Sequence, residues 1–374
     1  MNLCFFSIAS DFSTFHRRNE IESFADQNRD LKIVYFTSIR FLFSYFMKRI
    51  LGKERALDKA TKNNIKIHNL FSLLPLRLAT KSKTLMYITV VLPIKLQVYF
   101  SKRKYGMDGE TYTWFYKPDQ YIYLSELGPY IYLHYDNYKA DKTYSFSHSP
   151  NFDLIVKKCI EESEMSLICS ARLFRDYKRY TADKVIYYPN AISNTLDLKK
   201  QDISRLRNNK VIGFVGQVDK TFDSELLEEI AVNFPQYELR LIGGVKNDNV
   251  LELSRQYKNI NLIGYIDYND LSSYIDEFSI GICPYIINEF NSYRNPLKIV
   301  EYFSRGLPVV TVPCDISDSI SELVTLAEDK AHFISGIKNE LEKNDQYKVD
   351  RRQELARKNR WDSRVKLVLE NINR

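Results

Sequence analysis

The most constraining feature of the chain is an alternation of strand-like and helix-like segments that runs through its first half and starts again near residue 210. An apolar run at residues 3–8 is followed by a helix-forming stretch and a second apolar run at residues 31–36. Residues 210–216 open the same succession again. Strands that alternate with helices pair into parallel sheets covered by helices. The sequence therefore predicts an α/β protein with two doubly wound domains.

The length of the chain agrees with two domains, because 374 residues are many for a single core. The polar stretch at residues 194–209 reads as a linker. We therefore expect an N-terminal domain over residues 1–205 and a second domain from residue 206. In doubly wound sheets ligands bind at the carboxyl ends of the strands, so we expect both sheets to face a central ligand-binding cleft.

The cysteines and the N-terminus indicate a reducing compartment. The five cysteines are scattered and form no C-x-x-C pair, which argues against a disulfide framework and against a zinc site. No Asp-x-Asp motif lies in a strand context, so we expect no metal. The first residues are apolar but lack a basic start, which is typical of a first strand and not of a signal peptide. We therefore predict that the protein is cytoplasmic.

The segment at residues 40–104 is basic, apolar and aromatic. It holds fifteen lysines and arginines against two acidic residues, a net charge of +13. Its longest uncharged run is about a dozen residues, short of the roughly 20 that a spanning helix needs. We expect this segment to bind an anionic membrane surface. The alternative is a solvated basic face over ordinary core helices. Nucleic acid is not an expected partner, because no nucleic-acid-binding motif accompanies the charge.

The strongest local motif is residues 295–301. Asn295 is a good N-cap and Pro296 a good first helical residue, so a helix should begin here and end at Gly306. Lys298 and Glu301 are three residues apart and share one face of that helix. A helix N-terminus with a lysine suits a pyrophosphate, and a glutamate suits ribose hydroxyls. The alternative is a capped amphipathic helix with an exposed ion pair.

With this motif in its context, the chain resembles the GT-B glycosyltransferases, most closely the bacterial family 1/family 4 type that builds teichuronic acid, capsule and exopolysaccharide. The resemblance rests on these matches: Pro296, Lys298, Glu301 and Tyr302; Phe214 to Gln217; Asp223; Pro189 to Ala191; Ile263 to Ile266; Pro284 and Tyr285; and Trp361 with Asp362. It implies two Rossmann-like domains, a donor domain over residues 206–355, and a C-terminal helix at residues 356–374 that crosses back to the first domain.

The resemblance also implies the roles of individual residues. The donor-binding residues would be Gly216, Gln217, Asp223, Ile266, Pro284, Tyr285, Arg294, Lys298 and Glu301. If the enzyme inverts, it needs a base near the acceptor hydroxyl; Asp136 is the expected base, and His16 and Asp11 are the next candidates. Arg17 or Arg294 would stabilise the leaving diphosphate. Tyr293 stands where many retaining relatives have an acid, so the retaining or inverting outcome stays open.

The expected function is transfer of a hexose from a UDP- or GDP-linked sugar, with no cofactor, to a lipid-linked saccharide in cell-surface polysaccharide biosynthesis. The protein would lie on the inner face of the cytoplasmic membrane. Two alternatives remain. One is a sugar-nucleotide epimerase of the same fold, and the other is a non-catalytic sugar-nucleotide-binding partner in a polysaccharide assembly complex.

Overall fold

The computed structural model describes residues 1–9, 11–13, 15–52, 62–181, 183–194, 196 and 198–372. These residues form two compact units. Unit 1 comprises Met1–Cys169, Leu173–Tyr188 and the segment from Arg364 onward, and unit 2 comprises Ser170–Arg172 and Pro189–Ser363. The sequence offers Ser13 and Thr14 as N-caps of a helix through residues 17–25, and Thr14 lies outside the described residues.

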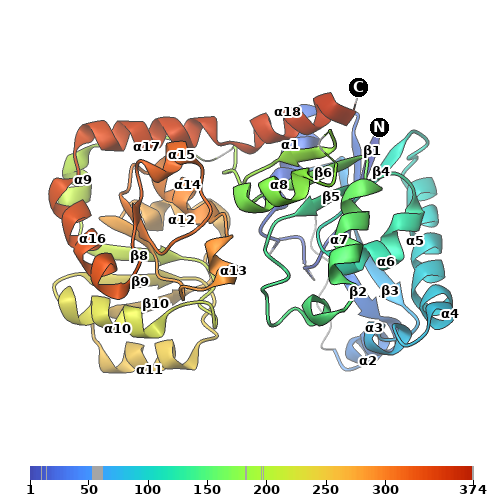
Figure 1. Cartoon of the computed structure of the whole chain (residues 1–374), viewed down its shortest axis with the longest axis horizontal. Coiled ribbons are helices and arrows are strands. Elements are labelled where there is room, and N and C mark those ends of the chain that lie inside the picture. The colour runs from blue at the N-terminus through green and yellow to red at the C-terminus, as the bar shows by residue number, and fades with distance from the viewer. Residues whose placement is uncertain are drawn as a thin grey trace. The chain divides into compact units, whose positions relative to one another are not determined.

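Unit 1 is built on a seven-stranded, wholly parallel sheet of order β3-β2-β1-β4-β5-β6-β7 (Figure 1). The strands are β1 (Asn2–Phe6), β2 (Lys32–Phe41), β3 (Ile65–Ser72), β4 (Thr111–Phe115), β5 (Tyr130–His134), β6 (Met165–Ile168) and β7 (Val185–Tyr187). The strand order reverses direction between β1 and β4, which is the usual position of a ligand in a doubly wound sheet. The prediction of a parallel α/β domain is confirmed.

The helices of unit 1 mostly connect consecutive strands. They are α1 (Arg18–Gln27), α2 (Leu42–Ile50), α3 (Leu76–Ala79), α4 (Lys83–Met86), η1 (Tyr87–Val91), α5 (Leu92–Lys104), α6 (Tyr121–Leu124), α7 (Phe152–Glu161) and α8 (Ala171–Lys178). Short 3-10 turns lie at η2 (Pro118–Gln120), η3 (Ser125–Leu127) and η4 (Ser145–His148).

The basic segment contains more regular structure than its sequence predicts. It contributes β3, the edge strand, and a helix that runs without a break from Lys83 to Lys104 through α4, the π-helical η1 and α5. This helix has 22 residues and is the one described helix long and apolar enough to cross a membrane. The short uncharged run therefore wrongly suggested that the segment contains no helix of that length. The core helix of a soluble protein meets the same criteria. Residues 53–61 of the segment lie outside the described residues.

Unit 2 is built on a six-stranded parallel sheet of order β10-β9-β8-β11-β12-β13. Its strands are β8 (Val211–Val215), β9 (Glu238–Ile242), β10 (Ile260–Gly264), β11 (Ile280–Cys283), β12 (Val309–Thr311) and β13 (Thr325–Leu326). The strand order reverses direction between β8 and β11. Figure 1 shows α10 (Ser224–Asn233) and α11 (Asp248–Gln256) on one face of this sheet, and α12 (Tyr268–Ile275) and α14 (Leu297–Ser304) on the other.

The remaining helices of unit 2 complete its cover. They are α9 (Ile203–Asn208), α13 (Glu289–Ser292), α15 (Asp318–Ser321), α16 (Lys330–Lys343) and α17 (Gln346–Lys358). The last helix, α18 (Trp361–Ile372), begins in unit 2, and its residues from Arg364 belong to unit 1.

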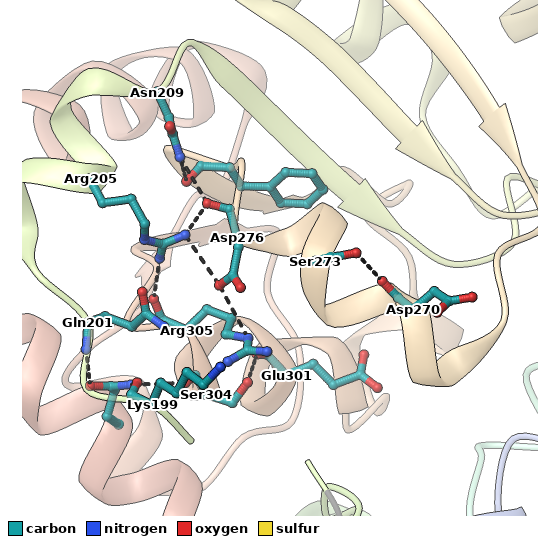
Figure 2. A network of polar contacts seen from close by, with 12 residues as sticks. Lys199, Gln201, Arg205, Asn209, Asp270, Ser273, Asp276, Glu301, Ser304 and Arg305 are labelled. Atoms are coloured by element: carbon teal, nitrogen blue, oxygen red, sulfur yellow. Dashed lines mark hydrogen bonds and ion pairs between the residues drawn. The ribbon is translucent and has the colours of Figure 1, made fainter. Parts of the chain in front are cut away.

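The structure divides the chain at residues 188 and 189, earlier than the predicted boundary at residue 205. The reason is a polar network that ties residues 199–209 to unit 2 (Figure 2). Arg205 and Arg305 both approach the Asp276 carboxylate, at 3.4 Å each, and Arg205 also donates to the Arg305 carbonyl at 3.0 Å. Gln353 donates to the Lys199 carbonyl at 2.8 Å. Residues 199–209, which the sequence predicts as a linker, are therefore bound to unit 2 by long-range contacts.

Candidate functional site

Helix α14 is fixed against the ends of β8 and β11 by one side chain. The Tyr302 hydroxyl accepts a hydrogen bond from the Val215 amide at 2.9 Å. The Tyr302 ring lies so close to Gly281 that a Cβ there would be 2.3 Å from it. Ile299 and Phe303 are fully buried beside Tyr302. Helix α14 is thereby held against β8 and β11, between which the strand order of unit 2 reverses.

The first residues of this helix differ in detail from the prediction. Pro296 occupies the N-cap position and makes no side-chain cap, so the prediction that Asn295 caps the helix was wrong. The Asn295 side chain has other partners: its amide donates to the Asp315 carbonyl at 3.0 Å, and its oxygen accepts from the Asn190 amide at 3.1 Å. The predicted helix end is confirmed, since Gly306 follows α14 with φ +67°.

Four of the predicted donor residues meet in one cluster: Gly216, Tyr285, Arg294 and Lys298. The Lys298 ammonium donates to the Tyr285 hydroxyl and lies 4.0 Å from the centroid of the Phe214 ring. The Arg294 guanidinium lies 4.9 Å from the Tyr285 ring. Two cations thus stand around one aromatic ring. Gly216 has φ +139°, which strains any other residue, and a Cβ there would be 2.7 Å from the Lys298 nitrogen, so the ammonium would have to shift.

Glu301 lies one helical turn beyond Lys298 and is almost entirely buried. Burial raises the pKa of its carboxyl to about 7, against the opposing effects of the Lys298 charge and the Tyr268 hydroxyl. Burial and the Glu301 carboxyl in turn raise the pKa of Tyr268. The exposed ion pair of the alternative interpretation is therefore absent for Lys298 and Glu301, both of which lie in the described part of the chain. Glu301 is a half-neutral buried acceptor, which suits hydroxyl ligands.

The other donor candidates lie near this cluster but have different surroundings. Gln217 follows Gly216 and is exposed, and Ile266 follows β10 and is partly buried. The Pro284 carbonyl accepts a hydrogen bond from the Asp223 amide at 2.9 Å. The Asp223 carboxylate serves as the N-cap of α10, where it accepts from the Leu226 amide at 2.9 Å. The Asp223 carboxylate therefore has a structural role as a helix cap.

In unit 1, the segments that carry the two catalytic candidates meet at Tyr135, at the carboxyl edge of the sheet. His16 lies between β1 and α1, and Asp136 lies two residues beyond β5. The rings of His16 and Tyr135 are in edge contact, with centroids 5.1 Å apart, and Tyr135 directly precedes Asp136. His16 is exposed and Asp136 is half-buried. Residues 120 positions apart in the chain are thus gathered around Tyr135.

Arg17 and Asp11 have other surroundings than the sequence suggested. The Arg17 guanidinium is fully buried and pairs with the Glu20 carboxylate through two bonds of 2.7 and 3.1 Å. A guanidinium held in that way points into the core of unit 1. The expectation that Arg17 stabilises a leaving diphosphate does not agree with this position. Asp11 lies 4.0 Å from the Arg40 guanidinium.

Sequence reasoning missed several residues of the cluster in unit 2. Phe214 was read only as part of the strand end, yet its ring faces the Lys298 ammonium. Thr221 accepts from Arg294 at 3.3 Å, and Tyr268 adjoins Glu301. These contacts join residues that are distant in sequence, so no local pattern indicates them. Asn190, which contacts Asn295, could be recognised from the sequence, because it lies in the Pro189 to Ala191 motif.

Part of unit 2 is similar to a known family of proteins. Residues 209–343 match the family described as Glycosyl transferases group 1. The chain is 27% identical over 106 residues to a Bacillus subtilis protein named as a teichuronic acid biosynthesis glycosyltransferase, TuaH. That alignment covers 28% of this chain and spans only 27% of the relative's length.

Solved structures match over the whole chain. Anabaena Alr3699/HepE in complex with UDP and glucose has a TM-score of 0.67 at 14% identity, and the match covers 100% of this chain and 99% of that chain. Staphylococcus aureus TarM, in complex with fondaparinux, alpha-GlcNAc-glycerol and UDP, has a TM-score of 0.68 at 11% identity, with both chains fully covered. The chain therefore has the GT-B fold of these structures, and its residues 209–343 match the family of group 1 glycosyl transferases.

Proposed function

We propose that this protein transfers a sugar from a nucleoside diphosphate sugar, UDP-linked in preference to GDP-linked, to a saccharide acceptor. The observation that carries the proposal is the cluster at the reversal point of the unit 2 sheet. There, Lys298 and Arg294 surround Tyr285, and Glu301 lies one turn further along α14. Two cations suit a diphosphate and a buried carboxyl suits ribose hydroxyls. The preference for UDP rests on the UDP held by structures of similar fold.

The chemical step in this proposal uses residues of unit 1. Asp136 would act as the base that takes the proton from the acceptor hydroxyl, and His16 is the second candidate. Their common position around Tyr135 supports the choice. Asp136→Asn should lower kcat at least a hundredfold while donor binding stays unchanged, because an amide accepts no proton. A variant with wild-type kcat would remove Asp136 from the mechanism and leave His16→Ala as the next test.

The activity itself is tested by incubating the purified chain with a panel of sugar nucleotides and a membrane lipid extract. We expect release of a nucleoside diphosphate that depends on both the donor and the extract, and its loss in Lys298→Ala. Lys210→Ala, which alters an exposed lysine directly before β8, is the matched control. Conversion of the sugar nucleotide without an acceptor would favour the epimerase, and no turnover with any donor would contradict both.

We further propose that the acceptor is lipid-linked, that it belongs to a cell-surface polysaccharide such as capsule or exopolysaccharide, and that the protein is a cytoplasmic one peripheral to the inner membrane. The name of the Bacillus subtilis relative supports the polysaccharide role. The exposed surface of residues 40–52 and 62–104 supports the proposal that the protein binds a membrane. These residues include twelve lysines and arginines and no aspartate or glutamate.

Two helices of this surface carry apolar side chains that face outward. Helix α2 buries none of its residues, and Phe43, Phe46 and Ile50 are 65%, 51% and 77% exposed. The helix from Lys83 to Lys104 has an outer stripe at Leu85, Ile88, Leu92, Leu96 and Tyr99. The spacing of three and four residues puts this stripe on one face. Exposed apolar stripes with basic neighbours are typical of helices that lie in an anionic membrane interface.

The opposite face of the long helix belongs to the core of unit 1, which favours contact in the membrane plane over a span. Met86, Val90, Ile94 and Val98 are buried there. The Gln97 side chain donates to the Phe71 carbonyl at 2.8 Å and accepts from the Phe71 amide at 3.0 Å, closing the free edge of β3. Spanning a bilayer would require the loss of these contacts.

Vesicle sedimentation tests the membrane proposal. The chain should bind vesicles with about 30% anionic lipid much better than neutral ones, and salt should weaken binding, because each basic residue near the surface contributes about 1 kcal/mol. Leu92→Asp should reduce binding at least fivefold. Val232→Asp is the control, since Val232 is 58% exposed on unit 2. Equal binding by Leu92→Asp and the wild type would exclude the stripe as the contact.

A further inference from the structure

We propose that Tyr285 is a positioning residue that aligns the two cations Lys298 and Arg294 toward one anionic ligand. The proposal rests on the donor site described above and adds how the site is organised. Tyr285 acts through its two neighbours: its hydroxyl holds the ammonium, and its ring carries the guanidinium. The ligand is a diphosphate, whose two charged groups match two cations.

The Lys298 ammonium is held by neutral groups. It donates to the Tyr285 hydroxyl and lies 4.0 Å from the Phe214 ring centroid, within the range of a cation–π contact. Its distance to the Tyr285 ring centroid is longer, 4.8 Å, so the ammonium meets Tyr285 at the hydroxyl end. Neutral partners fix the position of a cation and leave its charge available to an anion.

Arg294 reaches the same ring from the α13 side. Its guanidinium lies 4.9 Å from the Tyr285 ring and donates to Thr221 Oγ1 at 3.3 Å. The Thr221 hydroxyl in turn donates to the Asp219 carboxylate at 2.7 Å. The Tyr285 ring and the Thr221 hydroxyl therefore direct the guanidinium together with Asn291 Oδ1, which accepts from it at 3.3 Å, and the Phe290 ring, 5.3 Å away.

Tyr285 is itself rigid enough to serve as the reference for both cations. It is 6% exposed, and it pairs with Phe222 in an antiparallel bridge. The next residue, Ile286, donates its amide to the Thr221 carbonyl at 2.9 Å. The segment that carries Thr221 is thus bonded to the segment that carries the ring, so these two contacts of Arg294 are held in a fixed relation.

Calorimetry with ligands of increasing phosphate number tests the proposal. Uridine, UMP and UDP are titrated into the wild type, Tyr285→Phe and Tyr285→Leu, and inorganic pyrophosphate serves as a probe without a nucleoside. Tyr285→Phe removes the hydroxyl and keeps the ring, so UDP should bind about tenfold weaker, UMP less affected and uridine unchanged. Tyr285→Leu removes both the hydroxyl and the ring and should weaken UDP binding further. Tyr237→Phe is the matched control, because Lys210 lies 5.0 Å from the Tyr237 ring at the opposite edge of the sheet.

The outcomes separate this proposal from the donor assignment. Wild-type UDP affinity in both Tyr285 variants overturns the positioning role, and so does an equal loss for uridine and UDP, which marks a general folding defect. If the wild type binds no uridine nucleotide but Tyr285→Phe weakens pyrophosphate binding about tenfold, the positioning role stands and the uridine nucleotide assignment fails.

Discussion

Replacing Glu301 by glutamine should stabilise unit 2 at neutral and alkaline pH. The buried Glu301 carboxyl has its pKa raised from 4.5 to about 7 by burial. Between pH 4.5 and 7 the folded state keeps a proton that the unfolded state releases, so stability falls as the pH rises through this range. The difference between the two pKa values corresponds to about 3 kcal/mol at 1.36 kcal/mol per unit. Glutamine does not ionise and avoids this loss.

The assay uses the two tryptophans of the chain, because Trp114 lies in unit 1 and Trp361 in unit 2. In a Trp114→Phe background, urea unfolding followed by fluorescence reports on unit 2 alone. The free energy of unfolding of Glu301→Gln relative to its parent should rise by about 3 kcal/mol between pH 4 and pH 8. Comparing the two pH values removes the constant effects of the amide. Glu342→Gln, at an exposed position of α16, is the control.

A relative stability of Glu301→Gln that stays level between pH 4 and pH 8 would refute the reasoning, because it would mean that Glu301 titrates in the folded state as it does in water. The same variant should bind UDP at least tenfold weaker, since a neutral amide accepts weaker hydrogen bonds from ribose hydroxyls. A gain in stability together with a loss of binding would mark Glu301 as a residue kept for function.

Three further outcomes are expected. The affinity of the wild type for UDP should rise with pH between about 5 and 7 and then level off, because ribose hydroxyls favour the ionised Glu301; calorimetry that finds a falling affinity contradicts this. Gly216→Ala should weaken UDP binding at least tenfold because of its φ of +139° and the nearby ammonium, whereas Gly244→Ala, whose Cβ meets nothing within 4 Å, should bind normally. Asn190→Ala breaks a 2.7 Å bond to the Asn295 carbonyl and should destabilise unit 2 by about 1 kcal/mol in urea unfolding; an unchanged midpoint would exclude the contact.

The local patterns of the chain were sufficient for the two-sheet architecture and for the helix that carries Lys298 and Glu301. Apolar runs of five or six residues and amphipathic stretches between them depend on near neighbours, so β1, β8 and α14 were recognisable. The edge strand β3 was not, since its apolar positions are interrupted by the exposed Lys66 and the half-buried His68. The Asn295 cap was predicted wrongly because its side chain has long-range partners in Asn190 and Asp315.

The sequence by itself determined the fold class, the helix motif that carries Lys298 and Glu301 and the presence of a basic apolar segment, because each depends on residue types at short spacing. Only the tertiary structure decided how these residues are used. It buries Glu301 and so changes its acidity, turns Arg17 into the core, and places Tyr285 between Lys298 and Arg294. Burial and contacts across a sheet depend on residues that are far apart in the chain, and the local pattern does not contain that information.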